Sequence, residues 1–129
     1  MFILADSIFI AETESMGRGV FTRKFIPEGT VIEISPVVVM DAEQRILLDK
    51  TRLHDYIFVW GLQQNQCCMA LGYVPIYNHA FSSNCEYEMD YDSETIKIFA
   101  VRNIEANEQL FINYNGEWDN NKELWFSAV

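Results

Sequence analysis

The chain has 129 residues, of which 50% are hydrophobic and 22% are charged. A chain of this length and composition is expected to fold as one domain that buries about two thirds of its unfolded surface, rather than to stay disordered. Its 19 acidic and 9 basic residues give a formal net charge of -10, which argues against direct nucleic-acid binding, because a phosphate backbone requires a basic surface. The charge favours a basic partner, such as a lysine-rich protein segment, although acidity that serves only solubility would explain it equally well.

The three cysteines Cys67, Cys68 and Cys85 form an odd set without C-x-x-C spacing, and the chain has only two histidines. We therefore expect reduced thiols and neither a disulfide framework nor a metal site. The sequence shows no basic, apolar leader and no apolar run close to the roughly 20 residues of a membrane span. These features predict an intracellular protein that does not act at a membrane and that is cytoplasmic or, in a eukaryote, nuclear.

Turn residues divide the first forty positions into short strands. Pro27-Glu28-Gly29 is typical of a tight turn. Pro36 is expected to interrupt the chain before the β-branched run Val37-Val38-Val39, which predicts a buried strand. The strands expected in this part of the chain are residues 8–12, 19–25, 30–34 and 37–39.

The middle of the chain is more varied. Asp41 is a suitable N-cap for a helix that extends to about Asp49. Residues 53–62 are ambiguous between helix and strand by periodicity, and we favour a helix. A short buried strand is expected over 67–71. From 72 to 83 the pattern disappears, which predicts a long loop of the kind that is often functional in compact domains.

A β-hairpin is the clearest element of the C-terminal half. Between Cys85 and Tyr91 apolar residues alternate with acidic ones, and a turn at 92–94 leads into a strand over 95–101. Gln109–Tyr114 is expected to form a final strand. The predicted architecture is therefore mostly β with one or two short helices, in a single domain over residues 1–129.

Short motifs occur in a defined order along the chain. They are Gly17-Arg18-Gly19-Val20-Phe21, Tyr56-Ile57-Phe58, Asn78-His79 with Asn84, and Glu108 through Tyr114. Together they resemble the motifs of the SET-domain family, the S-adenosylmethionine-dependent protein-lysine methyltransferases. Each motif alone would be a weak match, but their order and spacing are hard to obtain by chance. The resemblance extends from about Ile8 to Trp118.

The resemblance implies a β-clip-like fold of several small sheets with short helices and a C-terminal pseudoknot. Many members carry a cysteine-rich, zinc-binding tail that completes the active site, whereas only residues 115–129 follow the last motif here. Those residues, or a second subunit, would then close the site. A homodimer is therefore one expectation.

The resemblance also implies a set of cofactor-binding residues: Gly17, Arg18, Gly19, Asn78, His79, Tyr114 and Trp118. Asn78 would hydrogen-bond the amino group of S-adenosylmethionine, and His79 would meet the adenine through its main chain. Trp118 suits stacking on the adenine, although a core or interface tryptophan fits equally well. The glycines, taken alone, would more often form a simple strand-entry turn.

Tyr114 is the expected catalytic residue, because its phenol would lie beside the sulfonium and orient the incoming amine. An apolar channel, with Tyr56 in its wall, would favour the neutral lysine that the reaction requires. The alternative is an ordinary tyrosine in a half-buried strand. Two residues before Tyr114, the family uses tyrosine or phenylalanine to limit the number of methyl groups added. Ile112 occupies that position, which predicts di- or trimethyllysine.

The predicted function is thus methylation of a lysine in a basic segment such as a histone-like tail. A catalytically inactive SET-like module that binds basic peptides is the first alternative, and a structural or assembly protein is the second. Retention of Gly17, Gly19, Asn78 and Tyr114 together counts against a decayed cofactor pocket. Residues 37–66, the part least like the family, are expected to determine peptide specificity.

Overall fold

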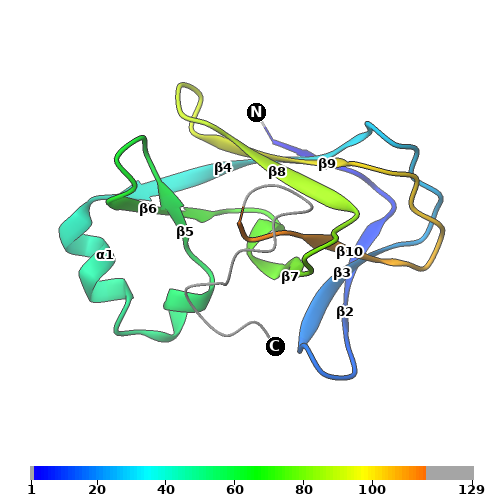
Figure 1. Cartoon of the computed structure of the whole chain (residues 1–129), viewed down its shortest axis with the longest axis horizontal. Helices are drawn as coiled ribbons and strands as arrows, with labels where there is room; N and C mark the ends of the chain where they lie inside the picture. The colour runs from blue at the N-terminus through cyan, green and yellow to red at the C-terminus, as the bar shows by residue number, and fades with distance from the viewer. Residues whose placement is uncertain (1, 116–129) are drawn as a thin grey trace.

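The computed structural model describes residues 2–115 and arranges their strands in two sheets (Figure 1). The larger sheet has the order β5-β6-β4-β9-β8, with β1 beside β4. Its strands are β1 (Ile3–Leu4), β4 (Val31–Met40), β5 (Phe58–Trp60), β6 (Gln66–Ala70), β8 (Cys85–Asp90) and β9 (Thr95–Ala100). The smaller sheet has the order β2-β3-β10-β7. Its strands are β2 (Ile8–Glu12), β3 (Arg18–Thr22), β7 (Asn78–His79) and β10 (Gln109–Ile112).

Three short helical segments complete the described chain: α1 (Ala42–Leu48) and the 3₁₀ turns η1 (Arg52–Asp55) and η2 (Val74–Ile76). In Figure 1, α1 lies at one end of the molecule and the β2–β3 hairpin lies at the other. The expected mostly β architecture with short helices is confirmed. Within residues 2–115, no helix has the length and apolar character needed to cross a membrane.

One hydrophobic core joins the two sheets. Side chains from β3, β4, β9 and β10 are completely shielded from solvent within a single cluster: Val20, Ile32, Ile96, Ile98, Leu110 and Ile112. Because this cluster draws on both sheets, burial of apolar surface holds them together as one packed unit.

β4 contradicts the expected interruption at Pro36, because the strand runs through this residue without a break. The proline is tolerated because β4 changes partners at this point. Ile34 pairs with β1, whereas Val37 begins the pairing with β6. Pro36 has no N–H to donate, but this missing donor falls between the β1–β4 and the β4–β6 ladders. The carbonyl of Pro36 still accepts a hydrogen bond from the Leu71 N–H at 3.0 Å.

β3 is shorter than expected, because it ends at Thr22 rather than at Phe25. The Thr22 hydroxyl donates to the carbonyl of Lys24 at 2.8 Å, a local side-chain bond that competes with strand pairing. The chain returns to β geometry only at Ile26, in a single bridge to Ile104.

The helix after Asp41 is confirmed and has a complete capping box. The Asp41 carboxylate accepts from the Gln44 N–H at 2.9 Å, and the Gln44 side chain accepts from the Asp41 N–H at 3.1 Å. The helix expected over 53–62 is wrong, since the turn η1 is followed by strand β5. Phe58 of β5 pairs with Cys68 of β6, and this hairpin pairing overrides an ambiguous local pattern.

The predicted hairpin and final strand are confirmed as β8, β9 and β10. Alternation along β8 buries Cys85 and leaves Glu88 and Asp90 exposed. The expected loop over 72–83 contains η2 and the short strand β7. The expected C-terminal pseudoknot involves residues 116–129, which lie outside the described residues.

Candidate active site

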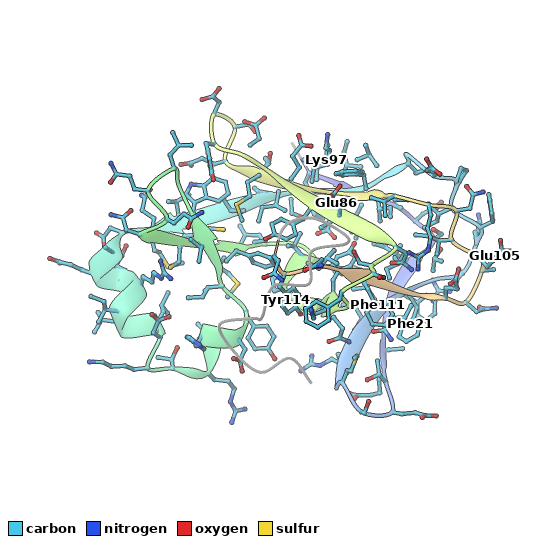
Figure 2. The ribbon with its side chains drawn as sticks, viewed as in Figure 1. Phe21, Glu86, Lys97, Glu105, Phe111 and Tyr114 are labelled. Carbon is cyan, nitrogen blue, oxygen red and sulfur yellow. The ribbon has the colours of Figure 1, made fainter. Side chains whose placement is uncertain are left out.

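Motifs that are distant in sequence meet at β10, the strand between β3 and β7. Gln109 lies opposite Phe21 in the antiparallel β3–β10 pair, and Phe111 lies opposite Asn78 in the parallel β10–β7 pair. In Figure 2, Phe21, Phe111 and Tyr114 lie close to one another in projection, with Tyr114 nearest the centre of the molecule. The glycine motif, the Asn-His pair and the final strand thus contribute to one region of the fold.

The two glycines at the start of β3 are required for different reasons. Gly17 has a φ of +70°, in the left-handed region that side chains disfavour. Gly19 has an ordinary φ, but a Cβ there would collide with Oε1 of Gln109 and would lie 3.0 Å from Nδ2 of Asn78. Backbone conformation therefore requires glycine at position 17, and packing requires it at position 19.

The orientation of the Asn78 amide is set by two acceptors. Its Nδ2 group donates to the Arg18 carbonyl at 3.1 Å and to Oε1 of Gln109 at 2.9 Å. Both amide hydrogens are thus used inside the protein, and Oδ1 is the atom left to accept from a ligand. Such an arrangement suits a donor such as an ammonium group.

Asn84, the last residue of the Asn-His motif, fastens the loop after β7 to β10. Its Nδ2 group donates to the Gln109 carbonyl at 2.9 Å, and its Oδ1 accepts from the Phe111 N–H at 2.8 Å. The side chain is 2% exposed. Asn84 therefore replaces part of the ladder that a neighbouring strand would supply.

His79 is buried and neutral. Its Nδ1 accepts from the Tyr114 N–H at 3.1 Å, which places the proton on Nε2. Nε2 is buried without a hydrogen-bond partner in the structure. Burial lowers the pKa of His79, because the charged imidazolium would lose its hydration.

Tyr114 follows β10 and is anchored at its hydroxyl. The phenol donates to the Tyr77 carbonyl at 2.7 Å, so its oxygen lone pairs are directed elsewhere. Burial, with smaller contributions from nearby Asp55 and Tyr56, raises the pKa of Tyr114 to about 12. The phenol is therefore protonated at neutral pH, and its orientation is set by this hydrogen bond.

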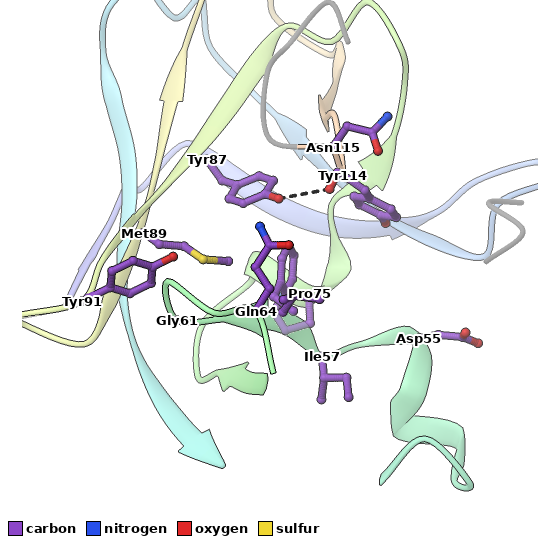
Figure 3. Close-up of a pocket in the computed structure, with 12 residues that line it drawn as sticks. Asp55, Ile57, Gly61, Gln64, Pro75, Tyr87, Met89, Tyr91, Tyr114 and Asn115 are labelled. Atoms are coloured by element: carbon purple, nitrogen blue, oxygen red, sulfur yellow. Dashed lines mark hydrogen bonds between the residues drawn. The ribbon is translucent and has the colours of Figure 1, made fainter. Parts of the chain in front are cut away.

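Two cavities meet at Tyr114. The larger, of ≈ 630 Å³, is lined among others by Gly17, Arg18, Tyr56, Asn78, His79 and Tyr114. The smaller, of ≈ 270 Å³, is lined among others by Phe58, Tyr87, Met89, Tyr91 and Tyr114 (Figure 3). Tyr114 therefore lines both the larger cavity and the smaller one, together with Asp55 and Pro75.

The larger cavity collects most of the residues expected to bind the cofactor. Gly19 does not line it, because the Asn78 and Gln109 side chains cover this glycine. Tyr56 lines the larger cavity and is not among the residues of the smaller one, the candidate for a lysine channel. Trp118 lies outside the described residues.

Among the residues of the site that were not expected from the sequence are Tyr87 and Gln109. Tyr87 on β8 lines the smaller cavity, and its hydroxyl donates to the main-chain carbonyl of Tyr114 at 3.1 Å (Figure 3). In the sequence, only the position of Tyr87 on the apolar face of the predicted hairpin indicated that this side chain points inward. No pattern in the sequence indicated that Gln109 orients Asn78, because this contact joins two strands that are far apart in sequence.

Known proteins resemble this chain over most of its length. The SET domain family matches residues 17–115. A histone-lysine N-methyltransferase of Schizosaccharomyces pombe, H3 lysine-37 specific, is 33% identical over 125 residues, which cover 96% of this chain and 80% of the relative.

Solved structures show the same fold. A Plasmodium falciparum protein assigned as a histone methyltransferase superposes with a TM-score of 0.64 at 29% identity, covering 86% of this chain and 99% of that one. A structure of Polycomb Repressive Complex 2 from Chaetomium thermophilum bound to S-adenosylmethionine superposes with a TM-score of 0.71 at 22% identity, over 85% of this chain and 15% of that one.

The fold and these matches define an enzyme class, the S-adenosylmethionine-dependent protein-lysine N-methyltransferases. Within it, the chain belongs to the SET-domain family.

Proposed function

We propose that this enzyme methylates a lysine in a basic segment of a histone-like protein and that it produces di- or trimethyllysine. The meeting of a larger cavity and a smaller one rich in aromatic residues at Tyr114 carries the proposal, because methyl transfer requires a cofactor and an amine to approach each other from two sides. The net charge of -10 would attract a basic segment. The Schizosaccharomyces pombe relative, named as specific for a histone H3 lysine, supports the substrate class.

The larger cavity is the proposed site of S-adenosylmethionine, which supplies an electrophilic methyl group. The residues present fit such a ligand, since Oδ1 of Asn78 is available to accept from its ammonium group. Gly17, Arg18 and His79 would contact the same molecule. Gly19 would leave the space that the Asn78 side chain needs. Trp118 remains a prediction for the adenine.

The smaller cavity is the proposed lysine channel. Phe58, Tyr87 and Tyr91 would surround the side chain with aromatic surface, which disfavours the charged amine, and this would make a dedicated base unnecessary. Asp55, which also lines the cavity, would act in the opposite direction and attract the amine while it is still charged. Tyr114 would orient the neutral amine through its oxygen lone pairs, because its proton is engaged by a carbonyl. Tyr56 would act at the junction, from the side of the larger cavity.

The degree of methylation rests on Ile112. The resemblance places an apolar side chain without a hydroxyl at the position where the family limits methylation. In the structure Ile112 is completely buried in the core and is not among the residues that line either cavity, so this proposal rests on the sequence position. We therefore expect room for more than one methyl group. Mass spectrometry of a peptide methylated to saturation checks this, and a product with a single added methyl group would contradict it.

We further propose that residues 1–129 act as one domain, that the enzyme works on chromatin in a nucleus or on DNA-packaging proteins elsewhere, and that it forms a homodimer. The Schizosaccharomyces pombe relative, named as specific for a histone H3 lysine, supports action on chromatin. Light scattering at several concentrations tests the dimer. A monomer at all concentrations would leave closure of the active site to residues 116–129.

Calorimetry with S-adenosylmethionine tests the proposed site. Wild-type protein should bind, Asn78→Ala should bind at least about tenfold more weakly, and Asn103→Ala should bind like wild type. Asn103 is a matched control, because its side chain accepts only from the Glu28 N–H at the surface. Methyl transfer to histone H3 peptides then tests activity. Binding of both cofactor and peptide without transfer would favour the inactive module instead.

A further inference from the structure

A buried carboxylate lies behind the active site. Glu33 of β4 is completely shielded from solvent, and within residues 2–115 no lysine or arginine forms an ion pair with it. Desolvation of an unpaired carboxylate is costly, and an apolar side chain of similar size would pack at this position more cheaply. A contribution to stability therefore does not explain why a glutamate occupies position 33.

The hydrogen bonds to Glu33 come mostly from one segment, the residues that lead into β7. Its Oε2 accepts from the Tyr73 N–H at 2.7 Å, and its Oε1 accepts from the Tyr77 hydroxyl at 2.9 Å. The Val74 N–H and the Ser35 hydroxyl also donate to it. A single side chain thus holds both ends of residues 73–77.

The backbone of this segment also lies directly over the carboxylate. A Cβ at Gly72 would collide with Oε2 of Glu33 and with the Ser35 hydroxyl. Tyr77 is itself completely buried. The segment therefore has little room to shift while Glu33 keeps its bonds.

This segment contains the acceptor that orients the Tyr114 phenol, whereas the Asn78 amide is oriented by Arg18 and Gln109. The Tyr77 carbonyl accepts the hydrogen bond that orients the Tyr114 phenol, and the next residue is Asn78. We propose that Glu33 is a positioning residue: through the Tyr77 side chain it fixes the main chain that orients Tyr114. The proposal rests on the proposed function, in which Tyr114 orients the lysine amine.

Two substitutions test the inference with little change in shape. Tyr77→Phe removes one hydroxyl and keeps the buried ring. Glu33→Gln keeps the size of the side chain but cannot accept from all its donors. Both should lower kcat by roughly tenfold, because a small misplacement of a catalytic group is costly. The KM for S-adenosylmethionine should stay within about twofold.

Thr95→Val is the matched control. Thr95 is also buried, and its hydroxyl is hydrogen-bonded to Ser93 at the far turn of the β8–β9 hairpin. The Thr95→Val protein shows how the loss of a buried hydroxyl affects the fold in general. Because Thr95 lines neither cavity of the active site, the kcat of this protein should match that of wild type. If Glu33→Gln fails to fold, Tyr77→Phe carries the test alone.

A spectroscopic readout separates this inference from the proposed function. The chain has six tyrosines, and labelling them with ¹³C at Cζ gives each a resonance that responds to hydrogen bonding of its hydroxyl. Tyr114→Phe assigns the Tyr114 resonance. That resonance should shift in Tyr77→Phe and Glu33→Gln and stay unchanged in Thr95→Val.

The outcomes are distinct. An unshifted Tyr114 resonance, or a kcat equal to that of Thr95→Val, would overturn the role of Glu33. A shifted resonance in a protein whose wild type binds cofactor but transfers no methyl group would overturn the proposed function and support the contact. A lower kcat together with the shift supports both.

Discussion

The hydroxyl of Tyr114 donates to the main-chain carbonyl of Tyr77, the residue just before Asn78, at 2.7 Å. This bond ties the residue after the last strand to the entrance of β7. It also determines which way the phenol oxygen presents its lone pairs. The orientation of the Tyr114 phenol therefore depends on a loop that is more than thirty residues away in sequence.

Tyr114→Phe should lower kcat by about 100-fold, because the substitution removes an oriented polar group at the junction of the two cavities. Affinity for S-adenosylmethionine should change by less than about threefold, since one lost hydrogen bond contributes about 1 kcal/mol at most sites. Steady-state kinetics and calorimetry measure the two quantities. Wild-type kcat in a folded Tyr114→Phe protein would remove Tyr114 from catalysis.

Gly19→Ala should weaken cofactor binding by more than about tenfold, because a methyl group would displace the Asn78–Gln109 hydrogen bond. Calorimetry measures the affinity. Urea unfolding on the same sample shows whether the loss is local. Unchanged affinity would mean that the two amides move aside without consequence.

Gln109→Leu should weaken S-adenosylmethionine binding roughly tenfold, because Asn78 loses the acceptor that helps to orient its amide. Gln109→Glu retains an acceptor and should bind within about threefold of wild type. The ratio of the two dissociation constants is the measurement. Equal affinities would show that the Arg18 carbonyl is sufficient to orient Asn78.

His79 should make stability fall on mild acidification. Burial holds its pKa below the ordinary value of 6.5, so below that pH the unfolded chain binds a proton that the folded chain does not. The stability present at neutral pH is therefore lost as the pH falls from 6.5 toward the folded pKa.

The measurement is the free energy of unfolding in urea at about pH 7.5 and about pH 5.5. His79→Asn keeps an acceptor for the Tyr114 N–H but does not titrate, so it should lose less stability over this range. The other ionisable groups are the same in the two proteins. An equal loss in the two proteins would show that His79 is not the group responsible.

The sequence by itself determined the elements that depend on neighbouring residues. The helix cap at Asp41 and the alternation along β8 act within a few positions, so local rules predicted α1 and the β8–β9 hairpin. Ordered motifs also indicated the family, and most of the cofactor residues that they predicted line the larger cavity, because residue type and spacing carry that information directly.

Only the tertiary structure decided the features that join distant positions. β5 replaced an expected helix because it forms a hairpin with β6, which itself pairs with the distant strand β4. Pro36 stayed inside β4 because the strand changes partners there. The contacts of Gln109 with Asn78 and of Glu33 with Tyr77 span 31 and 44 residues. These two contacts stabilise the protein only when the strands are packed together, so no local sequence pattern predicts them.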